Sequence, residues 1–404
     1  MKKEILIIGI ASLTLITNAQ KGLPIQYKKN ILEFPGGTDS FEVFWQKLDY
    51  LIYTGKGQIH IMHIGGSHVQ ADFWTGKMRQ LFQRYIMGAD APRGLVFPYK
   101  IARTNSPYNY TSSYTGKWKT CKISLVRKPC PNAGIMGYSA ITYDSSASFK
   151  IYFRYGETYP FTAVRIFYLD DSLSFIPIPD IPDSLIIDTI KGEGYIEYHF
   201  SEPLETIRIK LTRTDSLQKR FTLMGLQLMN DDAGIVVHNV GVNGASVKSY
   251  LKADHFINNI KVVKPDLIIF SVGINDALED DFSFETYVAR YDSLITSIKK
   301  VVPDVQIIFT TNNDSYYRWR YPNKRAFVVQ KAMRHLAEKY HAGYWDMFEI
   351  MGGLGSSWEW WLASYMQKDK IHFTKKGYFL IGELLFWAIM NAYGDHLRKV
   401  ERVD

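Results

Sequence analysis

Apolar and polar positions in two parts of the chain follow the pattern of strands that alternate with helices. An apolar run over residues 58–64 ends at two glycines, and apolar residues at three-to-four spacing then predict a helix over 72–87. Alternating elements of this kind favour a parallel sheet with helices on both faces. The pattern resumes downstream, where it predicts strands over 235–240, 266–272, 305–311 and 343–346, and helices over 247–260, 284–301, 323–340 and 374–393.

The stretch between these two parts has a different period. It is rich in Tyr, Ser and Thr, and polar and apolar residues alternate over 148–154, 163–168 and 206–211. Turns with Pro, Gly and Asp separate these runs, which is typical of an antiparallel β-sandwich or jelly roll. The sequence therefore predicts an all-β domain over 108–233, inserted into an α/β domain made of 20–107 and 234–404.

The first residues have the features of an export signal. Lys2 and Lys3 precede an apolar run over 5–16, and small residues follow up to Ala19. The run is shorter than the roughly 20 residues that span a bilayer, and no later segment is long and apolar enough to do so. We therefore expect residues 1–19 to be removed, leaving a periplasmic or secreted protein without a membrane span.

Composition and charge indicate a folded protein that does not bind nucleic acid. A hydrophobic content of 46% permits a sizeable core, and the net charge of +8 comes from scattered basic residues, so nucleic acid is not an expected partner. Cys121 and Cys130 form either a disulfide or two buried thiols, and the sequence leaves this open. No His or further Cys follows them at ligand spacing, and the sequence predicts no metal and no cofactor.

Ser67, Asp369 and His372 stand where the chemistry of a parallel sheet is expected. Ser67 follows two glycines at the end of the first strand, where a helix N-terminus favours developing negative charge. Asp369 precedes His372 by three residues, so its carboxylate can reach one imidazole nitrogen while the other faces a nucleophile. The three residues predict a nucleophile, a base and the acid that orients the base.

Gly244 and Asn275 follow the second and third sheet strands and are candidate oxyanion donors. A glycine offers its backbone N–H at close range and an Asn offers its amide, each worth about 3–4 kcal/mol in a preorganised site. With the N–H of Ser67 they would form an oxyanion hole. Each residue alone is a common cap or turn residue, but their coincidence at strand ends favours a serine esterase.

These segments together resemble the SGNH (GDSL-type) hydrolases. The four invariant residues of that family correspond to Ser67, Gly244, Asn275 and His372, and Asp369 completes the triad. The resemblance covers 20–107 and 234–404. It implies a flavodoxin-like, three-layer α/β/α fold with sheet order 2-1-3-4-5 and metal-free ester hydrolysis. The chain departs from the family at Gly66, where most members have Asp.

The predicted insertion narrows the resemblance to bacterial peptidoglycan O-acetylesterases, which remove acetyl groups from muramic acid. Related exported acetylesterases that act on plant polysaccharides such as xylan also carry jelly-roll modules, so they remain an alternative. A further alternative is a non-catalytic glycan-binding protein with a decayed site, which Gly66 alone favours.

Polar and aromatic residues after the fourth strand are candidate substrate contacts. They would stack a sugar or pair with a carboxylate at the rim of the site, or else form a plain solvent loop. Trp358, Trp360 and Trp361 form either a carbohydrate platform or a helix with inward aromatics. The side chain of His68 is expected to point away from Ser67. The candidate rim residues are Asp314, Tyr316, Arg318 and Trp319.

Overall fold

The computed structural model describes residues 22–86, 91–125, 128–317 and 320–400. The predicted signal peptide lies outside these residues. In the described part of the chain, none of the helices combines the length and apolar content that a bilayer span requires.

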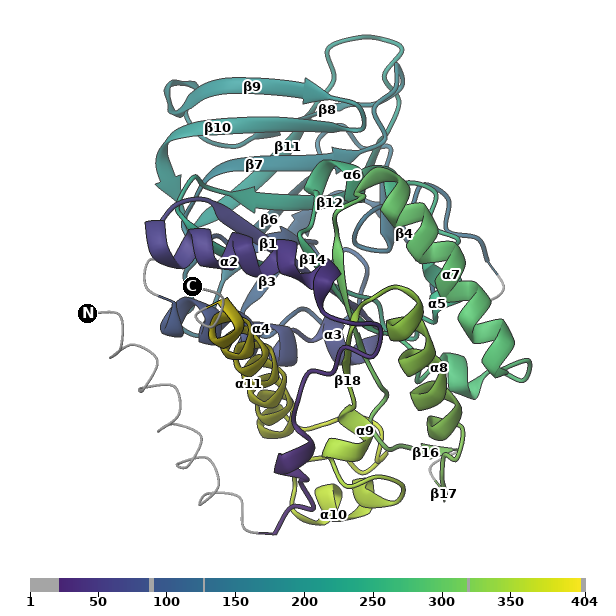
Figure 1. Cartoon of the computed structure of the whole chain (residues 1–404). Coiled ribbons are helices and arrows are strands. Elements are labelled where there is room, and N and C mark those ends of the chain that lie inside the picture. The colour runs from purple at the N-terminus through teal and green to yellow at the C-terminus, as the bar shows by residue number, and fades with distance from the viewer. Residues whose placement is uncertain (1–21, 87–90, 126–127, 318–319, 401–404) are drawn as a thin grey trace.

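Five parallel strands form the central sheet, in the order β13-β1-β14-β15-β18 (Figure 1). Numbered along the chain within this sheet, the order is 2-1-3-4-5, as expected. The strands are almost completely buried because both faces of the sheet are covered. Their bounds are β1 Gln58–Gly65, β13 Gly234–Gly241, β14 Leu267–Ser271, β15 Gln306–Thr310 and β18 Gly343–Trp345.

Helices cover both faces of this sheet, which gives three layers. One hydrophobic cluster packs α2 (Glu42–Thr54), α4 (Phe73–Tyr85) and α11 (Lys375–Val400) against one face. A second cluster packs three other helices against the opposite face. These are α6 (Phe256–Val263), α7 (Phe284–Val301) and α8 (Ala326–Lys339). The α/β/α architecture predicted from the sequence is confirmed.

The predicted helix over 247–260 is wrong in one respect, because it is two helices. α5 (Val247–Tyr250) ends before α6 begins, and residues 251–255 connect them. At this break the backbone N–H of His255 donates to Ala133 O and Asp254 accepts from the N–H of Asn132. The chain therefore leaves the helical path where it meets a loop from the antiparallel part. Helix α2 was not predicted.

Two antiparallel sheets occupy the middle of the chain, above the α/β layers in Figure 1. The larger has the order β4-β5-β12-β7-β10-β9, with β2 paired to β12, and the smaller has the order β3-β6-β11-β8. These sheets agree with an inserted β domain, and its boundaries and jelly-roll type stay predictions. The larger sheet comprises β2 Gly94–Val96, β4 Trp118–Lys122, β5 Tyr138–Thr142, β7 Phe161–Tyr168, β9 Ile186–Gly192, β10 Tyr195–Leu204 and β12 Phe221–Met229. The smaller comprises β3 Tyr110–Thr115, β6 Ser148–Phe153, β8 Ile176–Pro179 and β11 Thr206–Thr212.

The antiparallel sheets and the parallel sheet share one core. A single hydrophobic cluster joins Val240 and Val242 of the α/β part to Tyr138 and Leu226 of the larger antiparallel sheet. Loops from the antiparallel sheets can therefore reach the edge where the parallel strands end. Cys121 and Cys130 form a disulfide at this junction, with 5.3 Å between their Cα atoms.

Candidate active site

Ser67 begins α3 (Ser67–Gln70), and one residue, Gly66, separates it from the end of strand β1. The N–H groups of Val69 and Gln70 donate to Gly66 O, so the turn closes within the two-glycine segment. A Cβ on Gly65 would lie 2.2 Å from the Val69 side chain, so only glycine lets α3 fold back onto the strand. Ser67 thus sits at the carboxyl edge of the sheet with an N–H that has no partner within the helix.

Ser67, His372 and Asp369 form a hydrogen-bonded chain. The Ser67 hydroxyl lies 2.7 Å from His372 Nε2, and His372 Nδ1 lies 2.8 Å from Asp369 Oδ2. An ionised carboxylate only accepts hydrogen bonds, so Nδ1 donates to it. In the neutral imidazole this leaves Nε2 as the acceptor for the serine proton. The structure therefore brings these three predicted residues together in the order that a nucleophile, a base and an orienting acid require.

The Asp369 carboxylate is held by its own loop. Besides His372 Nδ1, it accepts the backbone N–H groups of Ile371 at 2.9 Å and His372 at 3.0 Å. Partial burial alone would raise the pKa of Asp369, but these hydrogen bonds outweigh it and lower the pKa to about 2. The loop turns at Lys370, which has a left-handed backbone with φ 53°. Asp369 is therefore ionised at neutral pH.

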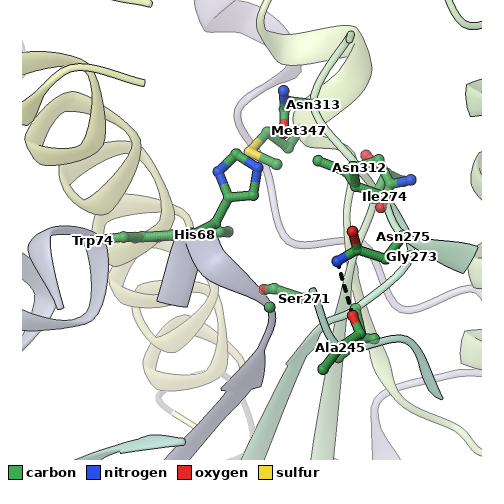
Figure 2. Close-up of a pocket in the computed structure, with 13 residues that line it drawn as sticks. His68, Trp74, Ala245, Ser271, Gly273, Ile274, Asn275, Asn312, Asn313 and Met347 are labelled. Carbon is green, nitrogen blue, oxygen red and sulfur yellow. Dashed lines mark hydrogen bonds between the residues drawn. The ribbon is translucent and has the colours of Figure 1, made fainter. Parts of the chain in front are cut away.

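Of the predicted oxyanion donors, Asn275 lies beside Gly66, the residue that precedes Ser67. Asn275 Nδ2 donates one hydrogen bond to Ala245 O at 2.9 Å, shown in Figure 2, which fixes the amide and leaves its second N–H free. Gly244 has φ 80°, a conformation that favours glycine. Among the described residues, the N–H groups of Ser67 and Gly244 donate to no other group. Within the described residues, these two backbone N–H groups and the second amide N–H of Asn275 are thus not used by other hydrogen bonds.

Gly66, where the family usually has Asp, lies against Asn275. A Cβ at position 66 would be 3.2 Å from Asn275 Nδ2, which is closer than ordinary van der Waals contact. Glycine here lets the Asn275 amide approach the backbone beside the nucleophile. The replacement removes a side chain, and the Ser67–His372–Asp369 hydrogen bonds are still present. Asp72, a nearby carboxylate, is fully buried and pairs with Arg79 and Arg93 instead.

The expectation for His68 was wrong, because its side chain is on the active-site side. Its ring stacks on His372 with 5.1 Å between centroids, and its Nδ1 lies 3.0 Å from the Tyr378 hydroxyl. Burial, followed by the nearby His372, lowers the pKa of His68 well below its ordinary value, so the ring is neutral. Its Nε2 is buried without a hydrogen-bond partner. Sequence alone gave no signal, because the direction of a side chain at a helix start depends on the turn before it.

A small pocket lies between His68 and Asn275, on opposite sides in Figure 2. Its volume is about 20 Å³, and a water-sized group needs roughly 10–15 Å³. The enclosed space is therefore about the size of a methyl group. Its wall consists of Gly66, His68, Trp74, Ala245, Ser271, Val272, Gly273, Ile274, Asn275, Thr311, Asn312, Asn313 and Met347.

The predicted rim residues divide into three groups. Asp314 does not face an open rim, because it is fully buried and accepts from Gly355 N–H and from the N–H and hydroxyl of Ser357. Tyr316 does lie near the triad, with its ring 5.0 Å from Lys370 Nζ. Arg318 and Trp319 lie outside the described residues.

The tryptophans of α10 (Ser356–Leu362) divide between an inward and an outward side, and the carbohydrate platform stays a prediction. Trp360 is fully buried, whereas Trp358 is 45% exposed. Lys370 Nζ lies 5.2 Å from the Trp358 ring and 5.1 Å from the Trp361 ring, so these two indoles reach the loop that carries Asp369.

The chain is similar in sequence to one protein family over part of its length. Residues 216–380 match the GDSL-like Lipase/Acylhydrolase family. This range contains Gly244, Asn275, Asp369 and His372, and Ser67 precedes it in sequence. Over these residues the chain is similar to GDSL-like acylhydrolases, and this match together with the fold supports a carboxylic ester hydrolase. No curated protein matches the chain in sequence.

A solved structure described as a peptidoglycan O-acetylesterase in action is similar over 90% of this chain and 99% of its own, with 20% identity and a TM-score of 0.74. At this identity the likeness establishes the fold, including the antiparallel sheets. A family two carbohydrate esterase from Cellvibrio japonicus (14% identity, 70% and 99% coverage, TM-score 0.30) also matches. So does a lipase/acylhydrolase from Enterococcus faecalis (22% identity, 40% and 77% coverage, TM-score 0.33).

Proposed function

We propose that this protein is an exported serine esterase that removes O-acetyl groups from a carbohydrate polymer, with peptidoglycan as the preferred polymer. The observation that carries the proposal is the hydrogen-bonded chain from Ser67 through His372 to Asp369, with the Asn275 amide beside it. The methyl-sized pocket supports acetyl as the acyl group. The fold similarity to a peptidoglycan O-acetylesterase, which extends over the antiparallel sheets, supports the choice of polymer.

Acyl transfer begins at Ser67. His372 Nε2 takes the proton of the Ser67 hydroxyl while Oγ attacks the ester carbonyl. Asp369 keeps its charge and stabilises the imidazolium that forms. The negative charge on the carbonyl oxygen is bound by the N–H groups of Ser67 and Gly244 and by the Asn275 amide, which are fixed before the reaction starts.

Collapse of the tetrahedral intermediate releases the sugar. His372 donates its proton to the leaving sugar oxygen, so the polymer hydroxyl departs and acetyl remains on Ser67. A water molecule then gives a proton to His372 and attacks the acyl carbon. Release of acetate restores the Ser67 hydroxyl, and no group beyond water is consumed.

The test compares acetate release from O-acetylated peptidoglycan and from acetylated xylan, using the mature chain and its Ser67→Ala variant. Loss of the nucleophile is expected to lower kcat by at least about 10⁴-fold. Ser216→Ala is the matched control, since Ser216 is exposed and lies between β11 and β12, outside the site. Labelling by a fluorophosphonate should occur in the wild type and the control and be absent in Ser67→Ala.

The outcomes separate the alternatives. Ser67-dependent release from peptidoglycan supports the proposed substrate. Release from xylan alone keeps the mechanism and moves the protein to polysaccharide degradation. No release of acetate from either polymer, together with no labelling of Ser67, would contradict the esterase proposal and favour a glycan-binding protein.

A further inference from the structure

The peptide that joins Asn243 to Gly244 is held by the antiparallel part of the chain. Asn243 O accepts one hydrogen bond from Lys122 Nζ at 3.0 Å and another from Ser124 Oγ at 2.8 Å. Lys122 is the last residue of β4, and Ser124 lies in the turn that follows. Both donors are about 120 residues away in sequence, with separations of 121 and 119.

The backbone N–H and the side-chain Nδ2 of Asn243 are also bound. Its N–H donates to Gln70 Oε1 at 2.7 Å, and its Nδ2 donates to Asn105 Oδ1 at 2.6 Å. Gln70 is fully buried and its Oε1 also accepts the Tyr138 hydroxyl at 2.9 Å. Asn243 therefore has little freedom to rotate, and part of this restraint again comes from the larger antiparallel sheet.

The orientation of this peptide decides where the Gly244 N–H points. The described chain contains no cis peptide, and in a trans peptide the C=O and the following N–H point in opposite directions. Holding Asn243 O toward Lys122 and Ser124 thus directs the Gly244 N–H away from them. A hydrogen bond from an ammonium group to the carbonyl also polarises the amide, so its N–H becomes a stronger donor.

We propose that Lys122 and Ser124 are positioning residues that aim the Gly244 N–H at the oxyanion of the reaction. The inference rests on the proposed esterase function and extends it, because it makes the antiparallel sheets part of the hydrolytic machinery. The disulfide between Cys121 and Cys130 is adjacent to Lys122 and closes the segment that bears both donors. The segment is thereby tied at its two ends.

The test measures hydrolysis of p-nitrophenyl acetate by the mature chain carrying Ser124→Ala, Lys122→Met, or both. A misdirected N–H weakens binding of the transition state more than binding of the ester. We expect kcat to fall about tenfold in Ser124→Ala and about 100-fold in the double variant, with KM within twofold of wild type. Lys122→Arg keeps a cationic donor and should recover most of the activity that Lys122→Met loses.

Lys119→Met is the matched control, because Lys119 is an exposed lysine of the same strand, with its Nζ near the ring of Tyr143. It should retain wild-type kcat. The rate of inactivation by a fluorophosphonate should fall in parallel with kcat, since that reaction also places charge in the oxyanion hole. Ser124→Ala removes only one oxygen atom and keeps the test valid if Lys122→Met does not fold.

Two results would overturn this inference alone. One is an unchanged kcat in the folded double variant while the wild type is active, which removes the positioning role and leaves the esterase proposal standing. The other is a loss of kcat that follows a loss of thermal stability and is not recovered by Lys122→Arg. A wild-type protein that neither hydrolyses the ester nor reacts with the fluorophosphonate overturns both proposals together.

Discussion

The two sides of the candidate site are built in different ways. On the base side, Asp369 is bound by Ile371 and His372, so all of its hydrogen bonds come from within three residues. On the oxyanion side, Asn243 is bound by Gln70, Asn105, Lys122 and Ser124, which are 119 to 173 residues away. A local loop needs only the final helix to be in place. The oxyanion side needs the antiparallel sheets to be folded and packed.

The two sides also differ in the state of their carboxyl groups. Asp369 gains hydrogen bonds that lower its pKa to about 2. Asp276, beside Asn275, accepts from the N–H of Val247, but burial outweighs this and raises its pKa to about 7. The base side therefore holds a fixed negative charge. On the oxyanion side the raised pKa leaves Asp276 only partly ionised at neutral pH, which suits a site that must bind developing negative charge.

The largest effect is expected from a substitution on the base side, at Asp369. Asp369→Asn should lower kcat on p-nitrophenyl acetate on the order of 10⁴-fold, because an amide no longer fixes the tautomer of His372 or stabilises its charge. Thermal stability should change little, since Asn still accepts the two backbone N–H groups. Asp183→Asn, an exposed residue of the antiparallel part, is the control. A loss of less than tenfold would show that His372 acts without Asp369.

The next largest effect is expected from removing the side-chain donor of the oxyanion side, the amide of Asn275. Asn275→Ala should lower kcat by about 10²–10³-fold with little change in KM, as expected for one oxyanion donor. Asn275→Asp keeps the size of the side chain but cannot donate, so it should be at least as inactive. If Asn275→Asp retained activity, the amide would have no role as a donor.

A smaller effect is expected from Gly244→Ala, and comparison with a second glycine distinguishes backbone strain from a role in catalysis. Gly244→Ala has space for its Cβ, whose nearest neighbour is the Ser124 side chain at 3.7 Å, but φ 80° is unfavourable for alanine. We expect the free energy of unfolding to fall by about 1–2 kcal/mol, measured with urea. Gly194→Ala is matched, with φ 76° and open space around the Cβ, in the turn between β9 and β10. Both should lose similar stability, and only Gly244→Ala should lose kcat.

The last prediction concerns Asp276, whose ionisation is expected to change the stability of the protein and to have the smallest effect on catalysis. Because the folded-state pKa is about 7 and the unfolded value is about 4, the folded chain holds the extra proton between these values. The contribution of Asp276 to stability is therefore full below pH 4 and is lost as pH rises toward 7. Asp276→Asn should reduce this slope in urea unfolding between pH 4 and 8. An identical slope in the variant would show that Asp276 is ionised when folded.

Much of the fold and of the base side was determined by the sequence itself. The apolar periods predicted the five parallel strands, because a buried strand and an amphipathic helix leave patterns that repeat over a few residues. The order of the strands followed from the resemblance to the SGNH hydrolases, and the structure has this order. The spacing of Asp369 and His372 predicted their contact for the same reason, since the hydrogen bonds stay within one turn of chain.

Tertiary structure alone decided the rest. It broke the predicted helix at 251–255, buried Asp314, turned His68 toward His372 and placed Lys122 on Asn243 O. Each of these outcomes depends on contact between segments far apart in the chain. The local periodicity of the sequence predicts which face of a helix or strand is buried. It does not predict which distant residue will pack against that face.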